Sequence, residues 1–340
     1  MDIARSEEQQ ELANIIQSLL AKRSDSEAVR VAMASETGYD ESLWQALCEQ
    51  VGVAALCIPE EYDGFGAGLV ETSIALEALG SNLAPNPLLA SASAAAALIL
   101  FGSEAAKQEL LPRIAAGTTA CLQVESDSEV TPLVLEGTAE IVLRVVSGDL
   151  QLVANPTVER VGALDQTLRF ARISDGTNSV IGSQVDVAAL VAIGQALASA
   201  LQVGGAQRGL DMTVAYSKER EQFGRTIGSF QALKHRMADM LVQVEASRSA
   251  SWGACAAAAA YLADPNPQTR DALLRLAAVA KAYCSEAFDH VAAETIQLHG
   301  GIAITWEHDA HLVFKRAHAL SQLFGRADQA RAGLLPTATD

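Results

Sequence analysis

The chain has 340 residues, of which 50% are apolar and 19% are charged, so it can bury a sizeable core and is not expected to be disordered. Its formal net charge of −17 argues against nucleic acid or an anionic membrane as a partner. The segment Met1–Glu8 lacks the pattern of a signal peptide, and the apolar stretch Leu88–Leu100 is too short to span a bilayer. We therefore expect a cytoplasmic protein.

The cysteines stand singly along the chain, at Cys48, Cys57, Cys121, Cys255 and Cys284. None forms a Cys-x-x-Cys pair, and none lies at metal-ligand spacing from a histidine. We expect each to be a small buried apolar residue in a reduced protein, and we expect no metal site.

Residues 1–118 are predicted to form a helical domain. Ser6 is a candidate N-cap for a helix whose apolar residues recur at helical spacing from Leu12 to Leu20. Gly52 ends a second predicted helix, and a glycine- and proline-rich loop follows at 56–68. Further helices are expected around residues 76–79, 92–101 and 103–114.

Residues 119–184 are predicted to form a small β domain. The runs 140–146 and 149–153 are rich in β-branched residues and are joined by Ser147-Gly148, which is typical of a β-hairpin. Another strand is expected at 167–173, followed by a turn at 175–178.

Residues 185–340 are predicted to be helical again. Apolar stripes at three- and four-residue steps run through 230–244 and 273–291, and Gly300-Gly301 ends the second stripe. The order is therefore helical, β, helical. Alternating βα units are absent from this pattern, which argues against a Rossmann fold.

Three spaced motifs resemble the acyl-CoA dehydrogenase family. They are Tyr216–Gln231, Gln297–Gly301 with Thr305–Glu307 after it, and the loop Ile58–Gly66 with Glu77–Gly80 after it. The resemblance implies a mainly α fold with an N-terminal helical domain, a small and here shortened middle β domain, and a C-terminal four-helix bundle. It also implies FAD-dependent α,β-desaturation of an acyl-CoA thioester.

The first motif supplies candidates for binding FAD. The permanent positive charge and forked donors of Arg220 suit a pyrophosphate, and Phe223 and Phe230 offer flat apolar faces. A surface salt bridge remains an alternative interpretation for Arg220, and simple core packing remains one for the two phenylalanines.

The end of the first motif and the second motif supply the other candidates. Gln231 ends the first motif and Gln297 begins the second, and their amide groups can hydrogen-bond adenine or ribitol atoms. Gly300 and Gly301 allow a ligand to approach the backbone closely, although a plain helix stop is the alternative interpretation. His299 stands beside the glycine pair and could also touch a ligand.

The carboxylate base that the family pattern implies is missing. One of its two positions, counted from the glycine pair, holds Phe324 followed by Gly325. The other falls near Gly194, in the segment 187–210, which holds no Asp or Glu. Neither phenylalanine nor glycine can accept a proton, and Asp328 is the nearest substitute.

The β domain also departs from the family pattern. Its segment Leu122–Glu129 keeps Glu125 but lacks the expected proline and glycine turn residues. We therefore interpret the chain as the small, incomplete subunit of an α2β2, steroid-type acyl-CoA dehydrogenase. A longer partner subunit would carry the base and share its FAD, with an electron-transfer flavoprotein as acceptor. The alternatives are a self-sufficient homo-oligomer with a relocated base and a non-enzymatic scaffold of this fold.

Overall fold

The computed structural model describes residues 5–124, 134–136 and 138–334, and it has the predicted helical, β, helical order. The N-terminal helices are α1 (Glu7–Arg23), α2 (Ser26–Ala34), α3 (Glu41–Ala46), α4 (Leu69–Ser81), α5 (Leu88–Phe101) and α6 (Glu104–Ala115). The predicted cap is confirmed, because the Ser6 hydroxyl accepts from the Gln9 N–H and the Gln9 side chain accepts from the Ser6 N–H. A single π-helical turn, Leu47–Val51, follows α3 and ends at Gly52, whose φ is +75°.

The β region contains two small sheets. One has the order β1-β3-β4-β7, made of β1 (Ala120–Val124), β3 (Ile141–Val146), β4 (Asp149–Ala154) and β7 (Thr177–Gly182). The other has the order β2-β6-β5, made of β2 (Val134–Leu135), β6 (Phe170–Ser174) and β5 (Thr157–Val161). The predicted hairpin is confirmed: β3 and β4 pair antiparallel, and Ser147 and Gly148 both have the positive φ that a tight hairpin turn requires.

The strand predicted at 167–173 begins later than expected, at Phe170, because Thr167 belongs to a buried polar cluster. Its N–H donates to the Asp165 carboxylate at 2.9 Å. Arg316, from the C-terminal region, donates to Asp165 at 3.0 Å and to the Thr167 hydroxyl at 2.7 Å. Both charged side chains are almost completely buried, at 1% and 0% exposure, so this pair joins the β region to the last long helix. The predicted turn after the strand is shorter than expected, since β7 already begins at Thr177.

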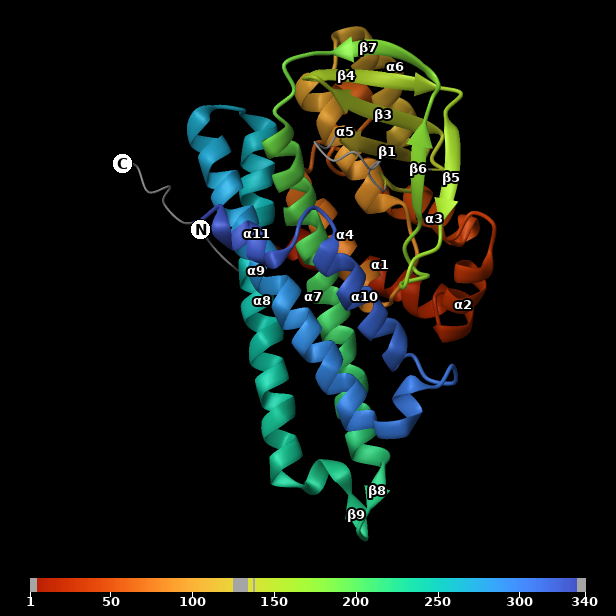
Figure 1. The fold of residues 1–340 in the computed structure, drawn as a ribbon, viewed down its shortest axis with the longest axis vertical. Coiled ribbons are helices and arrows are strands. Elements are labelled where there is room, and N and C mark those ends of the chain that lie inside the picture. Colours follow the sequence, from red (N-terminus) through yellow and green to blue (C-terminus); the bar gives the residue numbers. More distant parts are fainter. Residues whose placement is uncertain (1–4, 125–133, 137, 335–340) are drawn as a thin grey trace.

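The C-terminal region is a bundle of long helices. They are α7 (Val187–Glu219), α8 (Gln231–Ala263), α9 (Pro267–His299) and α10 (Ala310–Gln322), followed by the short α11 (Ala327–Ala332). α7 packs against the other three long helices. Between α7 and α8 the strands β8 (Glu221–Gln222) and β9 (Arg225–Thr226) form a hairpin at the end of the bundle remote from the sheets (Figure 1).

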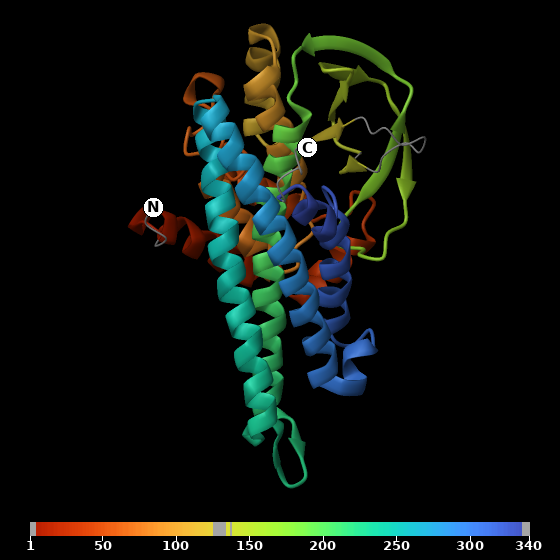
Figure 2. The same ribbon diagram turned by 60° about the vertical axis from the view of Figure 1, so that its left-hand side comes forward.

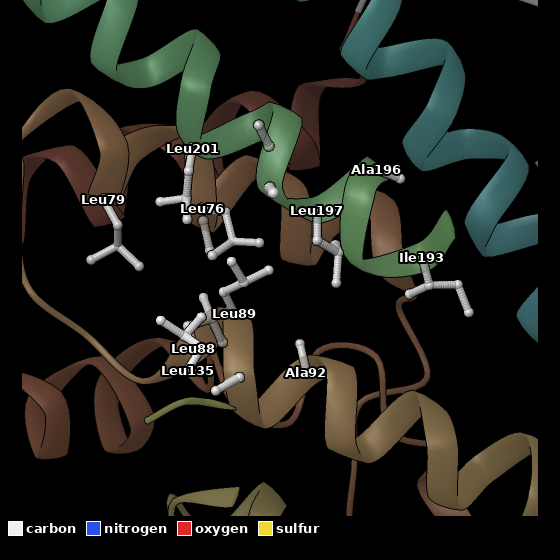
Figure 3. Close-up of a cluster of buried hydrophobic side chains, with 14 of the residues drawn as sticks. Leu76, Leu79, Leu88, Leu89, Ala92, Leu135, Ile193, Ala196, Leu197 and Leu201 are labelled. Atoms are coloured by element: carbon white, nitrogen blue, oxygen red, sulfur yellow. The ribbon is translucent and has the colours of Figure 1, made fainter. Parts of the chain in front are cut away.

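The core is continuous between the two helical regions. Figure 3 shows Ile193, Leu197 and Leu201 of α7 packed over leucines of α4 and α5. α7 is long and apolar enough to cross a membrane by length and composition, but 78% of its most apolar window is buried inside the protein. It is therefore placed as a core helix. Four of the cysteines are buried as predicted, and Cys48 is half-buried.

Candidate functional site

Phe324 and Gly194, which mark the two positions where a carboxylate base was expected, lie in contact. α10 ends at Gln322, and the chain then turns through Phe324 and Gly325, whose φ values are +58° and +95°. This turn lays the Phe324 ring against α7, so that a Cβ atom on Gly194 would lie 2.6 Å from the ring Cε1 atom. The Gln195 side chain donates a 2.9 Å hydrogen bond to the Phe324 carbonyl oxygen. A ring that cannot accept a proton therefore fills the space between α7 and this turn.

Lys281 on α9 holds the end of α10 in place, a role that its sequence pattern does not predict. Its side chain is fully buried, and its ammonium group donates to the carbonyl oxygens of Leu320 and Ser321 at 2.8 Å and 3.0 Å. A cation at a helix C-terminus satisfies free carbonyls and complements the helix dipole. Burial lowers the pKa of Lys281 to about 8. The one feature of the sequence that could have indicated this role is that Lys281 interrupts the apolar stripe at 273–291.

Asp328, the candidate substitute base, lies at the exposed start of α11. Its carboxylate accepts hydrogen bonds of 3.0 Å and 2.8 Å from the Arg326 side chain and remains 64% exposed. These bonds lower the pKa of Asp328 to about 2. A general base works best when its pKa is close to the working pH. A carboxylate held ionised by an arginine in solvent is therefore poorly suited to remove a proton from carbon.

The β8–β9 hairpin presents an aromatic and cationic tip. Phe223 is 92% exposed and has a φ of +55°. Its ring meets the edge of the Phe230 ring, with 6.2 Å between ring centroids, and the Arg225 guanidinium lies 3.9 Å from the Phe230 centroid. Arg220 ends α7 and is exposed, as are Arg225 and Lys218. This tip can contact a flat, anionic ligand or a partner beyond the chain's own surface.

The remaining candidates lie at the same end of the bundle (Figure 2). Gln231 begins α8, and its amide nitrogen lies 3.0 Å from the His235 Nε2 atom. Gln297 is exposed on the last turn of α9, just before Gly300 and Gly301. The sequence motifs thus place the ends of α7 and α9 and the start of α8 together, as a single functional surface would require.

The glycine pair has free space around it. Gly300 adopts a φ of +65°, a backbone conformation that favours glycine over residues with a side chain. Gly301 does not have a positive φ, and a Cβ atom on it would meet no other atom within 4 Å among the described residues. Packing within the chain therefore does not require glycine at 301. An open backbone of this kind fits a ligand or partner that approaches from outside.

One sequence-level observation cannot be placed. The segment Leu122–Glu129 is described only as far as Val124, the last residue of β1, so Glu125 lies outside the described residues.

The comparisons agree with this architecture. Residues 6–118 match the acyl-CoA dehydrogenase N-terminal domain, and residues 182–332 match the acyl-CoA dehydrogenase C-terminal domain. The chain is 45% identical over 318 residues to acyl-CoA dehydrogenase IpdE2 of Mycobacterium tuberculosis, covering 93% of each chain. It is 42% identical over 321 residues to acyl-CoA dehydrogenase IpdE2 of Mycolicibacterium smegmatis, covering 94% of this chain and 95% of the relative.

Two solved structures extend the likeness over nearly the whole chain. The ChsE4-ChsE5 complex from Mycobacterium tuberculosis superposes with a TM-score of 0.85 at 25% identity, covering 99% of this chain and 100% of that one. A variant of the Tcur3481-Tcur3483 steroid ACAD gives a TM-score of 0.85 at 26% identity, covering 96% of each chain. Fold, motifs and relatives converge, and the chain belongs to the acyl-CoA dehydrogenase family of oxidoreductases.

Proposed function

We propose that this chain is a catalytically degenerate subunit of a heteromeric, FAD-dependent acyl-CoA dehydrogenase. The packing of Phe324 on Gly194 carries the proposal, because neither residue has a carboxylate and the Phe324 ring fills the space beside Gly194. The α-proton of an acyl thioester is weakly acidic, so its removal needs a positioned base. That base would come from a partner subunit.

The intact end of the bundle supports a shared cofactor. The residues that would contact FAD are Arg220, Phe223, Phe230, Gln231, Gln297, Gly300 and Gly301. Phe223 is largely exposed although its ring contacts Phe230, and a Cβ atom on Gly301 would meet nothing within 4 Å in the part of the chain that the structure describes. When bound, the flavin supplies the hydride acceptor. Arg220 would pair with the pyrophosphate, and the glycine pair would allow close backbone approach.

The partner subunit is inferred from what this chain lacks, which is a base, and from what it keeps, which is the set of candidate FAD contacts. We propose a longer acyl-CoA dehydrogenase-like chain with a Glu at one base position, assembled with this chain as α2β2 in the cytoplasm. The ChsE4-ChsE5 complex among the similar structures supports a heteromeric assembly, and the steroid ACAD supports a steroid-derived acyl-CoA as substrate. An electron-transfer flavoprotein is the proposed electron acceptor.

The alternatives make different demands on the structure. A self-sufficient homo-oligomer needs a relocated base, and the solvent-exposed, arginine-paired Asp328 is poorly suited to that role. A non-enzymatic scaffold does not require an exposed aromatic and cationic tip at the same end of the bundle as an open glycine pair, whereas a shared cofactor would use both.

The test is to look for a longer acyl-CoA dehydrogenase-like chain that co-purifies with this one, and to reconstitute the two. We expect this chain alone to be colourless and inactive, and the complex to be yellow and to oxidise acyl-CoA. Flavin and turnover in the purified chain alone would overturn the proposal. Within the complex, Arg220→Ala should release flavin, whereas Arg113→Ala should not. Arg113 is a suitable control because it is an exposed arginine on α6, at the opposite end of the molecule from the hairpin (Figure 1).

A further inference from the structure

Three aromatic rings cluster beside the glycine pair, and two of them form a stack. The rings of Tyr216 and His299 lie nearly parallel, with 4.5 Å between centroids and an interplanar angle of 24°. The His308 ring covers the same corner, 4.6 Å from the His299 ring and 6.3 Å from the Tyr216 ring. No group of three His, Cys, Asp or Glu residues in the described ranges is arranged to hold a metal ion. The stack therefore needs an explanation other than metal binding.

The stack joins the two segments that carry the candidate FAD contacts. Tyr216 lies one turn before the end of α7, and its carbonyl oxygen accepts the Arg220 N–H at 2.9 Å. His299 is the last residue of α9 and directly precedes Gly300. A face-to-face contact between these rings therefore fixes where the end of α7 lies relative to the glycine turn.

The N-terminal region supports the stack from outside the bundle. Asp309 follows His308, and its carboxylate accepts hydrogen bonds from Arg30 and Ser26 of α2, each at 2.7 Å. Arg208 of α7 pairs with the same carboxylate at 3.7 Å. One carboxylate thus ties α2, α7 and the start of α10 to the loop that carries His308. The position of that ring is set by three elements remote from one another in the sequence.

The geometry fits a neutral His299. Its Nδ1 atom lies 2.7 Å from the Thr295 carbonyl oxygen, so Nδ1 carries the proton. Its Nε2 atom is buried and has no hydrogen-bond partner within the part of the chain that is described. Burial is the largest influence on the pKa of His299 and lowers it, the backbone of Thr295 and Met212 opposes this shift, and His308 adds to it.

The charges around this corner act on the histidines in both directions. Burial lowers the pKa of His308, the Asp309 carboxylate opposes this shift, and Arg208 and Arg30 add to it. Burial also lowers the pKa of His311, the next histidine on α10. An imidazolium at His299 would therefore be buried against the His308 ring, next to the Asp309 carboxylate and its two arginine partners.

We propose that His299, stacked on Tyr216, is a positioning residue that holds the glycine turn and the end of α7 in register for FAD. The proposal rests on the function proposed above. It states that the stack must be intact and His299 uncharged for the two segments to engage one cofactor together. FAD affinity should then fall as His299 becomes protonated.

The experiment measures FAD affinity of the reconstituted complex by flavin fluorescence at about pH 8 and about pH 5.5. We expect His299→Ala and Tyr216→Ala to weaken FAD binding about tenfold at the higher pH while the complex stays assembled. His299→Phe keeps a ring in the stack but cannot be protonated. It should bind FAD as the unmodified chain does at about pH 8 and should lose the weakening at about pH 5.5.

The outcomes separate this proposal from the one on which it rests. If His299→Ala and Tyr216→Ala bind FAD normally while Arg220→Ala does not, the positioning role is overturned and the shared cofactor stands. If Arg220→Ala also binds FAD normally, the proposed function fails. If FAD binding by His299→Phe still weakens at about pH 5.5, the weakening comes from protonation of a group other than His299. If the His299→Ala complex does not assemble, the FAD affinities of Tyr216→Phe and Tyr216→Ala are compared instead. Normal FAD affinity of Tyr216→Phe with weakened affinity of Tyr216→Ala supports the stack. Equal FAD affinities of the two variants overturn the positioning role.

Discussion

The ring of Phe324 occupies the space that any side chain on residue 194 would need. The two base positions of the family are therefore linked in this chain, since the missing side chain at Gly194 is what allows the Phe324 ring to lie on α7. Phe324 holds a left-handed backbone conformation to do so, which is unusual for a bulky residue. Restoring a carboxylate at either position would first have to displace this contact.

This contact predicts an unusual response to a helix-favouring substitution. Gly194→Ala should lower the free energy of unfolding by about 1–3 kcal/mol, because the new Cβ would overlap the Phe324 ring. In a Phe324→Ala background the same change should instead stabilise by about 0.5–1 kcal/mol, the usual gain of alanine over glycine in a helix. Denaturant unfolding of the single and double variants measures the coupling.

Gly253 on α8 is the matched control for that cycle. A Cβ atom on Gly253 would have no neighbour within 4 Å in the described structure, so Gly253→Ala should be stabilising in either background. Equal effects of Gly194→Ala and Gly253→Ala in the unmodified chain would contradict the placement of the Phe324 ring.

Local sequence patterns predicted the elements whose signals are local. The Ser6 cap, the hairpin at 140–153 and the glycine stop at 300 each depend on residues within a few positions of one another. The strands β1, β2, β5 and β7 were not predicted, and β5 and β7 show no apolar alternation because their side chains are mostly exposed. Their pairing partners, rather than their own residues, make them strands.

The site could be predicted in part for the same reason. Family motifs located the candidate FAD contacts and the missing base. The contact between Gly194 and Phe324 joins residues far apart in the sequence, as does the hold of Lys281 on the end of α10. Nothing in the sequence near any of these residues indicates which distant segment will cover it, so only the folded chain could reveal them.

Lys281 predicts a pH dependence of stability. Its pKa is lowered to about 8 in the folded chain from 10.5, so between these pH values the unfolded chain binds more protons than the folded one. Stability then rises with pH across this window, and the cost of burying the charge is fully present below about pH 8. From about pH 7 to about pH 10, the unmodified chain should gain roughly 1–3 kcal/mol in unfolding free energy relative to Lys281→Met. Lys22→Met, at an exposed lysine of α1, should show no such trend.

The buried pair of Arg316 and Asp165 predicts a large loss of stability when one partner is neutralised. Asp165→Asn leaves an uncompensated guanidinium at a site with 1% exposure, which should cost about 3–5 kcal/mol in unfolding free energy. Glu159→Gln breaks the exposed pair with Arg172 and should cost less than about 1 kcal/mol. Thermal unfolding of both variants measures the two losses of stability. If Asp165→Asn loses as little stability as Glu159→Gln, the buried pair does not join the β region to α10.

Asp328 provides the direct test of a relocated base. In the assembled complex, Asp328→Asn should leave the rate of acyl-CoA oxidation within about twofold, because its carboxylate is solvent-exposed and paired with Arg326. Replacing the Glu that we propose as the base of the partner subunit by Gln should abolish turnover in the same assay. A fall of more than about a hundredfold for Asp328→Asn, with flavin content unchanged, would instead place the base in this chain. The Phe324 ring would then have to be interpreted as a wall of a working acyl pocket rather than as the filling of a lost one.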